Sequence, residues 1–297
     1  MRKALVLALL GVTTALPVGA ADPFHAELDA WRQERAAALR RPDGWLTLVG
    51  LYWLDPGDNR VGSAADARVR LPAAAPARVG VLERRGETVR FVPAAGVDLR
   101  IDGQPARPTD LRSDSDGGEP SVVSIGSVSF FIIQRGERLA ARVKDSESAA
   151  RRDFAGIESY PPDPSWRLEA RFEPYRPVKQ VRVPTMLGTM AEMDSPGAVV
   201  FAHGGQTLRL DVFVEPGESD YFLIFGDTTN RRETYGGGRF LYAHPADATG
   251  RTVLDFNRAY NPPCAFSPYA TCPLPPRQNR LPVAIEAGEK RYAHGVH

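Results

Sequence analysis

The sequence predicts a mostly β protein with two β-rich halves, each a sandwich or barrel-like, and one helix at its N-terminal end. Two observations support this prediction. The chain holds 26 prolines among 297 residues, and proline disrupts long helices and central strands. Beyond residue 45, apolar residues alternate along short runs about 8–12 residues apart, a spacing typical of sandwiches and barrels.

Residues 1–21 have the features of a secretory signal. Two charged residues, Arg2 and Lys3, precede an apolar stretch over 4–16, and small residues follow at 18–21. Charge, apolar run and cleavage site occur in this order in such signals, although a buried N-terminal helix is the alternative. We therefore expect a periplasmic or secreted protein. No later run reaches the ~20 apolar residues that a membrane span needs.

The N-terminal helix is expected within residues 22–42. Asp22 suits the capping position and Pro23 the first turn of a helix, and the helix is expected to end near Arg40. Its apolar residues recur at helical spacing, so this stripe is expected to pack on the body of the protein. The stripe consists of Phe24, Leu28, Trp31 and Leu39.

The strand candidates form two sets, which we assign to an N-terminal sandwich-like domain over 43–158 and a C-terminal β domain over 159–297. The boundary follows from the proline-rich segment SYPPDPS at 159–165. The first set lies at 67–71, 80–83, 88–92, 98–101, 121–124, 128–134 and 139–143, with a hairpin-type turn at 102–103. The second set lies at 167–173, 178–183, 198–202, 207–214, 221–225, 239–242, 252–256 and 283–286.

Charge and motifs exclude several classes of function. Lys and Arg number 37 against 36 Asp and Glu, whereas broad nucleic-acid or anionic-membrane binders usually carry a basic excess. We therefore expect no nucleic-acid partner. The sequence also lacks the serine-hydrolase elbow, the zinc helix HExxH, the phosphate loop and the dinucleotide fingerprint. We expect no cofactor and no metal, and protein partners stay unknown.

Cys264 and Cys272 are the two cysteines of the chain and lie eight positions apart. In an exported protein the simplest interpretation is one disulfide that closes a short loop. In the chain-entropy model such a loop contributes roughly 2.5 kcal/mol. Two free thiols rank second. A metal site ranks third, because two thiolates need further ligands and no His or Cys lies at zinc-finger spacing.

Polar side chains are concentrated in residues 226–281, next to a run of three glycines and a stretch with seven prolines among 22 residues. Long irregular segments inside compact domains are usually functional or disordered, and the aromatic residues here favour order. We predict a polar hollow between adjacent strands, covered by the disulfide-tied loop. The candidate ligand-binding residues are Asp227, Thr229, Glu233, Tyr235, Arg239, Asp255, Asn257 and Tyr260.

Two functions fit this region. The first is binding of a small polar or anionic ligand, with Arg239 holding a carboxylate or phosphate at two points. The alternative is an exported hydrolase in which Asp227, Glu233 or Asp255 acts as acid or base and Arg239 neutralises developing charge. A mechanism through a cysteine thiol is a third idea, and whether the protein is an enzyme stays open. The structural interpretation pairs Asp255 with a buried Arg239. We expect Arg239→Ala to abolish binding without unfolding the chain.

Five stretches carry a resemblance to a known family. They are WLTLVGLYWLDPGDNRVGS (45–63), GIESYPPDPSWRLEARFEPY (156–175), ETYGGGRFLYA (233–243), LDFNRAYNPPCAFSPYATCPLPPRQNRL (254–281) and AGEKRY (287–292). In these stretches the chain resembles an uncharacterised bacterial family catalogued as domain of unknown function 1684. The resemblance extends over nearly the whole mature chain and implies that the C-terminal segment is the shared core of the family. It assigns no chemistry.

A second likeness lies in the N-terminal half. RVGSAADARVRLP (60–72), VGVLERRGETVRFVP (79–93) and IDGQP (101–105) have the rhythm of forkhead-associated domains, which are β-sandwiches that bind phosphothreonine. The likeness implies a sandwich architecture. That family continues with Ser and His residues that hold the phosphate. The corresponding stretch here reads AAAPARVGV (73–81), so the likeness does not extend to phosphopeptide binding.

Overall fold

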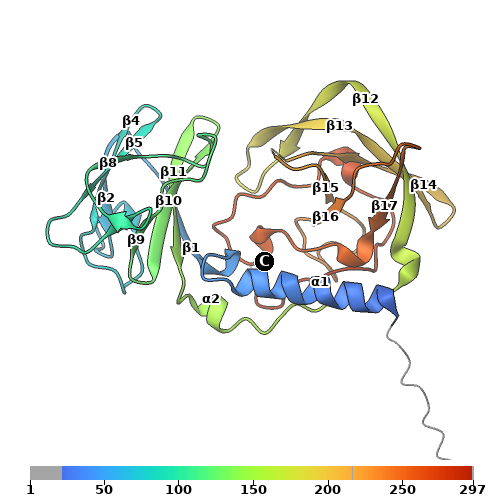
Figure 1. The fold of residues 1–297 in the computed structure, drawn as a ribbon, viewed down its shortest axis with the longest axis horizontal. Helices are drawn as coiled ribbons and strands as arrows, with labels where there is room; N and C mark the ends of the chain where they lie inside the picture. Colours follow the sequence, from blue (N-terminus) through green and yellow to red (C-terminus); the bar gives the residue numbers. More distant parts are fainter. Residues whose placement is uncertain (1–21, 216, 296–297) are drawn as a thin grey trace, which may run out of the picture.

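The computed structural model describes residues 22–215 and 217–295, so the signal expected at 1–21 lies outside the described residues. The chain is mostly β, as the sequence predicts, and its strands gather in two lobes (Figure 1). Two α-helices accompany them, α1 (Pro23–Arg40) and α2 (Ala149–Arg152). Within the described ranges, no helix is long and apolar enough to cross a membrane.

The first lobe is a sandwich of two sheets. One sheet has the order β1 (Leu48–Trp53), β11 (Arg138–Asp145), β10 (Val128–Arg135), β9 (Val123–Ile125), β6 (Arg100–Ile101) and β7 (Gln104–Pro105). The other has the order β3 (Val69–Arg70), β2 (Gly57–Gly62), β4 (Gly80–Arg85), β5 (Thr88–Pro93) and β8 (Thr109–Leu111). Alternate residues of each strand point inward, and Phe91 meets Phe130 across the sheets at 5.6 Å between ring centroids. The turn expected at 102–103 joins β6 to β7.

The second lobe wraps six strands around its own apolar core. β14 (Gln206–Val212), β13 (Met190–His203), β12 (Arg167–Pro184) and β17 (Arg251–Asp255) form one sheet in that order. β15 (Tyr221–Phe225) pairs with β16 (Arg239–Ala243). A bridge between Phe213 and Phe222 links the end of β14 to β15, so the strands nearly close around the core.

Two strand predictions for this lobe need correction. The runs at 167–173 and 178–183 belong to one strand, β12, whose pairing with β13 shifts between Pro174 and Lys179. Residues 283–286 form no strand. Their backbone serves another purpose, because the carbonyl of Ile285 accepts a hydrogen bond from a buried arginine, Arg239, at 2.8 Å.

Helix α1 lies along the lower side of the second lobe (Figure 1). Asp22 caps it by accepting a hydrogen bond from the Phe24 amide at 3.1 Å, as the sequence predicts. The helix is attached by polar contacts in addition to its buried apolar residues, Leu28 and Leu39. Arg35 donates to the Glu289 carboxylate at 3.1 Å and to the Asn261 carbonyl at 2.8 Å. The first helix is therefore bound to the last part of the described chain.

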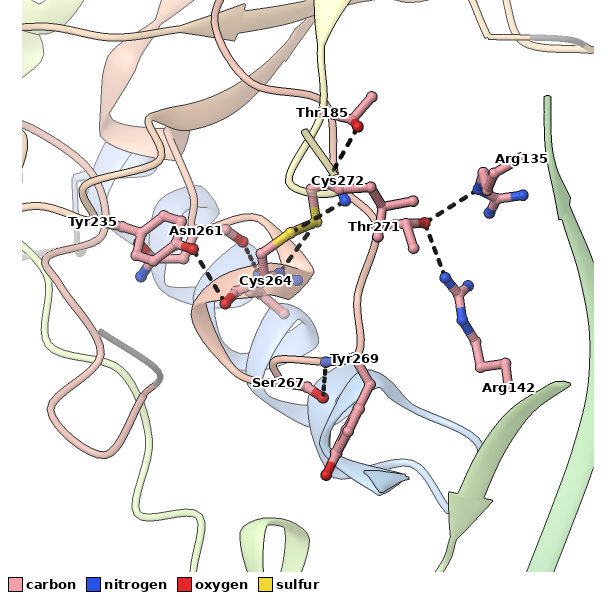
Figure 2. Close-up of a disulfide and its surroundings, with 12 residues drawn as sticks. Arg135, Arg142, Thr185, Tyr235, Asn261, Cys264, Ser267, Tyr269, Thr271 and Cys272 are labelled. Atoms are coloured by element: carbon pink, nitrogen blue, oxygen red, sulfur yellow. Dashed lines mark hydrogen bonds between the residues drawn. A yellow bond between two sulfur atoms is a disulfide. The ribbon is translucent and has the colours of Figure 1, made fainter. Parts of the chain in front are cut away.

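Five short 3₁₀ helices complete the fold. They are η1 (Trp45–Thr47), η2 (Pro164–Trp166), η3 (Phe256–Arg258), η4 (Pro263–Ala265) and η5 (Arg277–Asn279). The last two lie in residues 261–282, which we call the proline-rich segment. This segment contacts the first lobe, because the Thr271 hydroxyl accepts hydrogen bonds from Arg135 at 3.2 Å and Arg142 at 3.0 Å (Figure 2). Burial, with the nearby charge of Arg135, lowers the pKa of Arg142 to about 10.

Candidate functional site

A cavity of about 720 Å³ opens in the second lobe. Its walls come from the loop that follows β15, here called the glycine loop (residues 226–238), and from the proline-rich segment. Met186, in the turn between β12 and β13, and Arg291, near the end of the described chain, complete the lining. This volume lies within the 300–1,000 Å³ typical of small-molecule sites. The cavity is therefore the candidate site.

A network of hydrogen bonds holds the glycine loop in one conformation. The Asp227 carboxylate is fully buried and accepts from the Thr229 amide at 2.9 Å and from its hydroxyl at 2.6 Å. Because the Thr229 hydroxyl donates to this carboxylate, the Thr234 hydroxyl, 2.7 Å away, must donate to Thr229. Thr234 in turn accepts from the Asn230 amide group at 2.9 Å. Such a satisfied network makes the loop a preorganised wall.

Arg239 lies behind this wall and does not line the cavity. Its side chain is completely buried and donates to the Asp227 carboxylate at 2.8 Å. It also donates to the carbonyls of Ile285 at 2.8 Å and Ala287. The sequence predicts Arg239 as a ligand clamp, with Asp255 as its alternative partner. The structure instead pairs it with Asp227, because a buried charge needs a neutralising partner.

Two glycines of the loop, Gly236 and Gly238, leave space that the side chains of Arg231 and Pro275 fill. A Cβ on Gly236 would lie 3.0 Å from Cγ of Arg231. Gly238 has a φ of +87°, and a Cβ there would lie 2.3 Å from Cγ of Pro275. Arg231 itself has a φ of +69°, a conformation that residues other than glycine rarely adopt and that is common at functional sites. Gly236 therefore accommodates the Arg231 side chain, and Gly238 fits against the proline-rich segment.

Three exposed arginines, Arg231, Arg280 and Arg291, line the cavity and form what we call the arginine rim. Among residues 22–215 and 217–295, no carboxylate lies within 4.0 Å of any of these guanidinium groups, and none of them donates a hydrogen bond to the protein. Asp227 cannot neutralise the rim, since its carboxylate is buried against Arg239. The rim therefore carries uncompensated positive charge.

The lining of the cavity is also apolar in part. The apolar lining residues are Met186, Leu274, Leu281 and Tyr235. The Tyr235 hydroxyl donates to the Cys264 carbonyl at 3.2 Å (Figure 2). Burial raises the pKa of Tyr235, so the hydroxyl keeps the proton that it donates. The same cavity thus offers cationic and apolar contacts.

The predicted disulfide between Cys264 and Cys272 is confirmed, with Cα atoms 6.1 Å apart (Figure 2). It fixes the wall of the cavity, because the Cys272 carbonyl accepts from the Met186 amide at 3.0 Å. Two residues further on, the Leu274 amide donates to the Pro184 carbonyl at 2.7 Å. A mechanism through a cysteine thiol lacks its thiolate here, since both sulfur atoms are bonded. No group of three or more potential metal ligands occurs in the described part of the chain.

The remaining predicted site residues lie away from the cavity. Glu233 is exposed, and its carboxylate accepts from the Tyr160 hydroxyl at 2.8 Å. Asp255 and Tyr260 line a separate hollow of about 290 Å³ beside α1. The carboxylates of Asp227, Glu233 and Asp255 therefore do not meet in one cavity as an acid and base of a hydrolase would.

Asn257 is a structural residue. It is 1% exposed, and its side-chain oxygen accepts from the Asp163 amide at 3.0 Å. Its amide group donates to the Asp163 carbonyl at 2.9 Å. Thr229 is likewise buried within the network of the glycine loop. Of the eight predicted residues, Asp227 and Tyr235 line the cavity.

Sequence reasoning missed the arginine rim. Arg231 precedes the three glycines by a few residues, and Arg280 lies within the proline-rich segment, so both lie in the region that the sequence singles out. Arg291 comes from beyond it, in a stretch without any local signal of a site. Only the fold brings these three residues to one cavity.

Comparisons with known proteins give a family but no activity. The profile of the family described as "Protein of unknown function (DUF1684)" matches residues 152–290, so the stretch at 45–63 lies outside the match. An uncharacterised protein of Haloarcula marismortui, solved by NMR, is 32% identical over 47% of this chain and 78% of its own, with a TM-score of 0.41. No curated protein matches.

Two FHA domains are also similar to part of this chain. The structure of one belongs to a study of phosphothreonine-dependent FHA interactions; it is 18% identical over 32% of this chain and 92% of its own, with a TM-score of 0.23. The other is 17% identical over 31% of this chain and 89% of its own, with a TM-score of 0.22.

Proposed function

The chain belongs to the DUF1684 family of proteins of unknown function, and we propose that it binds a small anionic ligand in the cavity of its second lobe. One observation carries the proposal. Arg231, Arg280 and Arg291 converge on a cavity of about 720 Å³ without a neutralising carboxylate among the described residues. Guanidinium groups bind carboxylates and phosphates through paired, charge-assisted hydrogen bonds. An anion would supply the missing negative charge.

The rest of the cavity supports this role by being rigid. The network around Asp227 fixes the glycine loop, and the disulfide fixes the facing segment. A preformed site loses little conformational entropy when a ligand binds, so more of the contact energy appears as affinity. We assign the three rim arginines to ligand contact and Tyr235 to the wall. Arg239 holds Asp227 in place.

We also propose that the protein is exported. The charge and apolar pattern of residues 1–21 supports this, and so does the disulfide, because such bonds persist in oxidising compartments. Fractionation of cells, followed by N-terminal sequencing of the protein, tests the proposal. We expect a mature protein outside the cytoplasm that begins near residue 22. An unprocessed cytoplasmic protein would overturn it.

Titration with inorganic phosphate and with citrate, followed by calorimetry at constant ionic strength, tests anion binding. The key variant replaces the three rim arginines with glutamine. A matched control replaces three other exposed arginines, Arg78, Arg107 and Arg182, which do not line this cavity. Both variants lose the same formal charge, so a difference between them reports on the site and not on the overall field.

We expect at least one of these anions to bind the native protein with a millimolar or tighter dissociation constant. The rim variant should bind it at least about tenfold more weakly, because each lost charge-assisted hydrogen bond costs about 1.5–3 kcal/mol. The control variant should bind like the native protein. Binding that is absent from the native protein, or that is equal in both variants, would overturn the proposal.

A further inference from the structure

The cavity is far larger than an anionic group requires. A phosphate or carboxylate displaces only a few waters, each with a share of about 30 Å³ in the liquid. The cavity holds about 720 Å³. Ligand atoms other than the anionic head must therefore fill most of the space if the ligand is to exclude water from it.

The surface available to those atoms is apolar. Leu281 is 5% exposed and is fixed by a hydrogen bond from its amide to the Gly226 carbonyl at 2.8 Å. Leu274, two residues after Cys272 of the disulfide, is held by a hydrogen bond from its amide to the Pro184 carbonyl at 2.7 Å. The Tyr235 ring lies against Gly237, where a Cβ would come within 2.5 Å of it. These groups form a firm apolar wall that offers few hydrogen bonds to a polar ligand body.

Met186 also belongs to this apolar lining. It is 46% exposed although it is a large apolar residue, and its backbone is tied to the Cys272 carbonyl. A methionine side chain is unbranched and flexible, so it adapts to apolar groups of different shapes. Because it lines the same cavity as Leu274 and Leu281, it can contact the same ligand.

The backbone next to the rim is also open to an oxyanion. Gly236 and Gly237 line the cavity, and their amides donate no hydrogen bond to the residues that the structure describes. Glycine lets a ligand approach the main chain closely, and adjacent free amides can bind anions. The lining of the cavity thus divides into two chemical kinds, cationic side chains with free amides, and apolar groups.

From this division we infer that the ligand is an amphiphilic anion, with a phosphate or carboxylate head at the arginine rim and an aliphatic body against Met186, Leu274, Leu281 and the Tyr235 ring. The inference rests on the proposed anion binding and specifies its ligand. Soluble alkyl phosphates and the headgroups of anionic lipids share this chemistry.

The experiment compares inorganic phosphate, butyl phosphate and octyl phosphate, each below its micelle concentration, with octyltrimethylammonium as the cationic control. Binding to the full chain is measured by calorimetry at constant ionic strength. We expect affinity to rise from inorganic phosphate to octyl phosphate, by up to about fourfold for each methylene that becomes buried. The cationic control should not bind.

Two matched variants locate the aliphatic body. Met186→Ser removes an apolar side chain of the cavity, and Met190→Ser removes a similarly exposed one, at 48%, that does not line it. Both residues are exposed, so neither change should unfold the chain. Met186→Ser should weaken the binding of octyl phosphate several-fold and leave the binding of inorganic phosphate unchanged. Met190→Ser should change neither.

The outcomes separate the two proposals. If octyl phosphate binds no more tightly than inorganic phosphate, or if the two methionine variants behave alike, the inference is overturned and anion binding stands. If no anion binds, anion binding itself fails. If octyl phosphate binds, sedimentation with vesicles of anionic lipid distinguishes a lipid headgroup from a free solute as the source of the ligand. Octyl phosphate binding with co-sedimentation supports a ligand in the bilayer, and octyl phosphate binding without it supports a free solute.

Discussion

Arg231 lies in the glycine loop and Arg239 begins β16 directly after that loop, but their surroundings are opposite. Arg239 is completely buried and bonds to one carboxylate and two carbonyls. Arg231 is exposed at the cavity and bonds its guanidinium to no described residue. The difference teaches that polar residues concentrated near glycines serve both scaffold and site. Burial and partners, not residue type, separate the two roles.

The largest expected effect comes from breaking the buried pair. Asp227→Ala leaves the charge of Arg239 without compensation, and such a loss typically lowers the free energy of unfolding by about 3–5 kcal/mol. Chemical denaturation measures this. Arg239→Ala should be destabilising for the same reason, in contrast to the expectation from the sequence that it removes binding alone.

Substitutions in the arginine rim should have little effect on stability, in contrast to those in the buried pair. Arg231→Gln, Arg280→Gln and Arg291→Gln should each change the free energy of unfolding by less than about 0.5 kcal/mol, as exposed substitutions usually do. A small effect of Asp227→Ala, or a large effect of any rim substitution, would contradict the assignment of scaffold and site.

The second-largest expected effect concerns the disulfide, which belongs to both the scaffold and the site. Replacing Cys264 and Cys272 with serine should lower the free energy of unfolding by roughly 2.5 kcal/mol, because the unfolded chain is no longer constrained. It should also weaken anion binding, since the wall around Leu274 loses its support. Thermal denaturation and the phosphate titration measure the two effects. Stability loss with unchanged binding would show that the disulfide is purely structural.

The smallest expected effects come from two glycines of the loop, Gly236 and Gly238, which test the same comparison between scaffold and site. Gly238→Ala forces a side chain into a left-handed conformation against Pro275, so we expect a loss of about 1–3 kcal/mol in unfolding free energy. Gly236→Ala meets only the flexible side chain of Arg231 at 3.0 Å. It should cost little stability but weaken anion binding by displacing that arginine. If Gly236→Ala bound anions normally, Arg231 would not be a ligand-contacting residue.

Much of the fold could be predicted because its signals are local. Val89 and Phe91 are buried and alternate with exposed residues in β5, and Asp22 caps α1 with its own side chain. The cysteine spacing identified the disulfide. Proline was less informative in β12, since Pro174 sits where the register shifts within one continuous strand.

The site could be predicted only in part, because its decisive contacts are distant in sequence. The burial of Arg239 depends on the carbonyls of Ile285 and Ala287, which lie 46 and 48 positions away. Arg291 reaches the cavity from a different segment again. Composition therefore located the region, whereas the assignment of each residue required the tertiary structure.

The attachment of α1 has a consequence for the order of folding. Arg35 and its partner Glu289 are 254 positions apart, so the ribosome releases the helix long before the carboxylate that receives it. During synthesis this contact cannot form until Glu289 has emerged from the ribosome. Contacts of such long range also slow folding, because the loop between them must close first. A chain truncated before Glu289 would lack this attachment for its first helix.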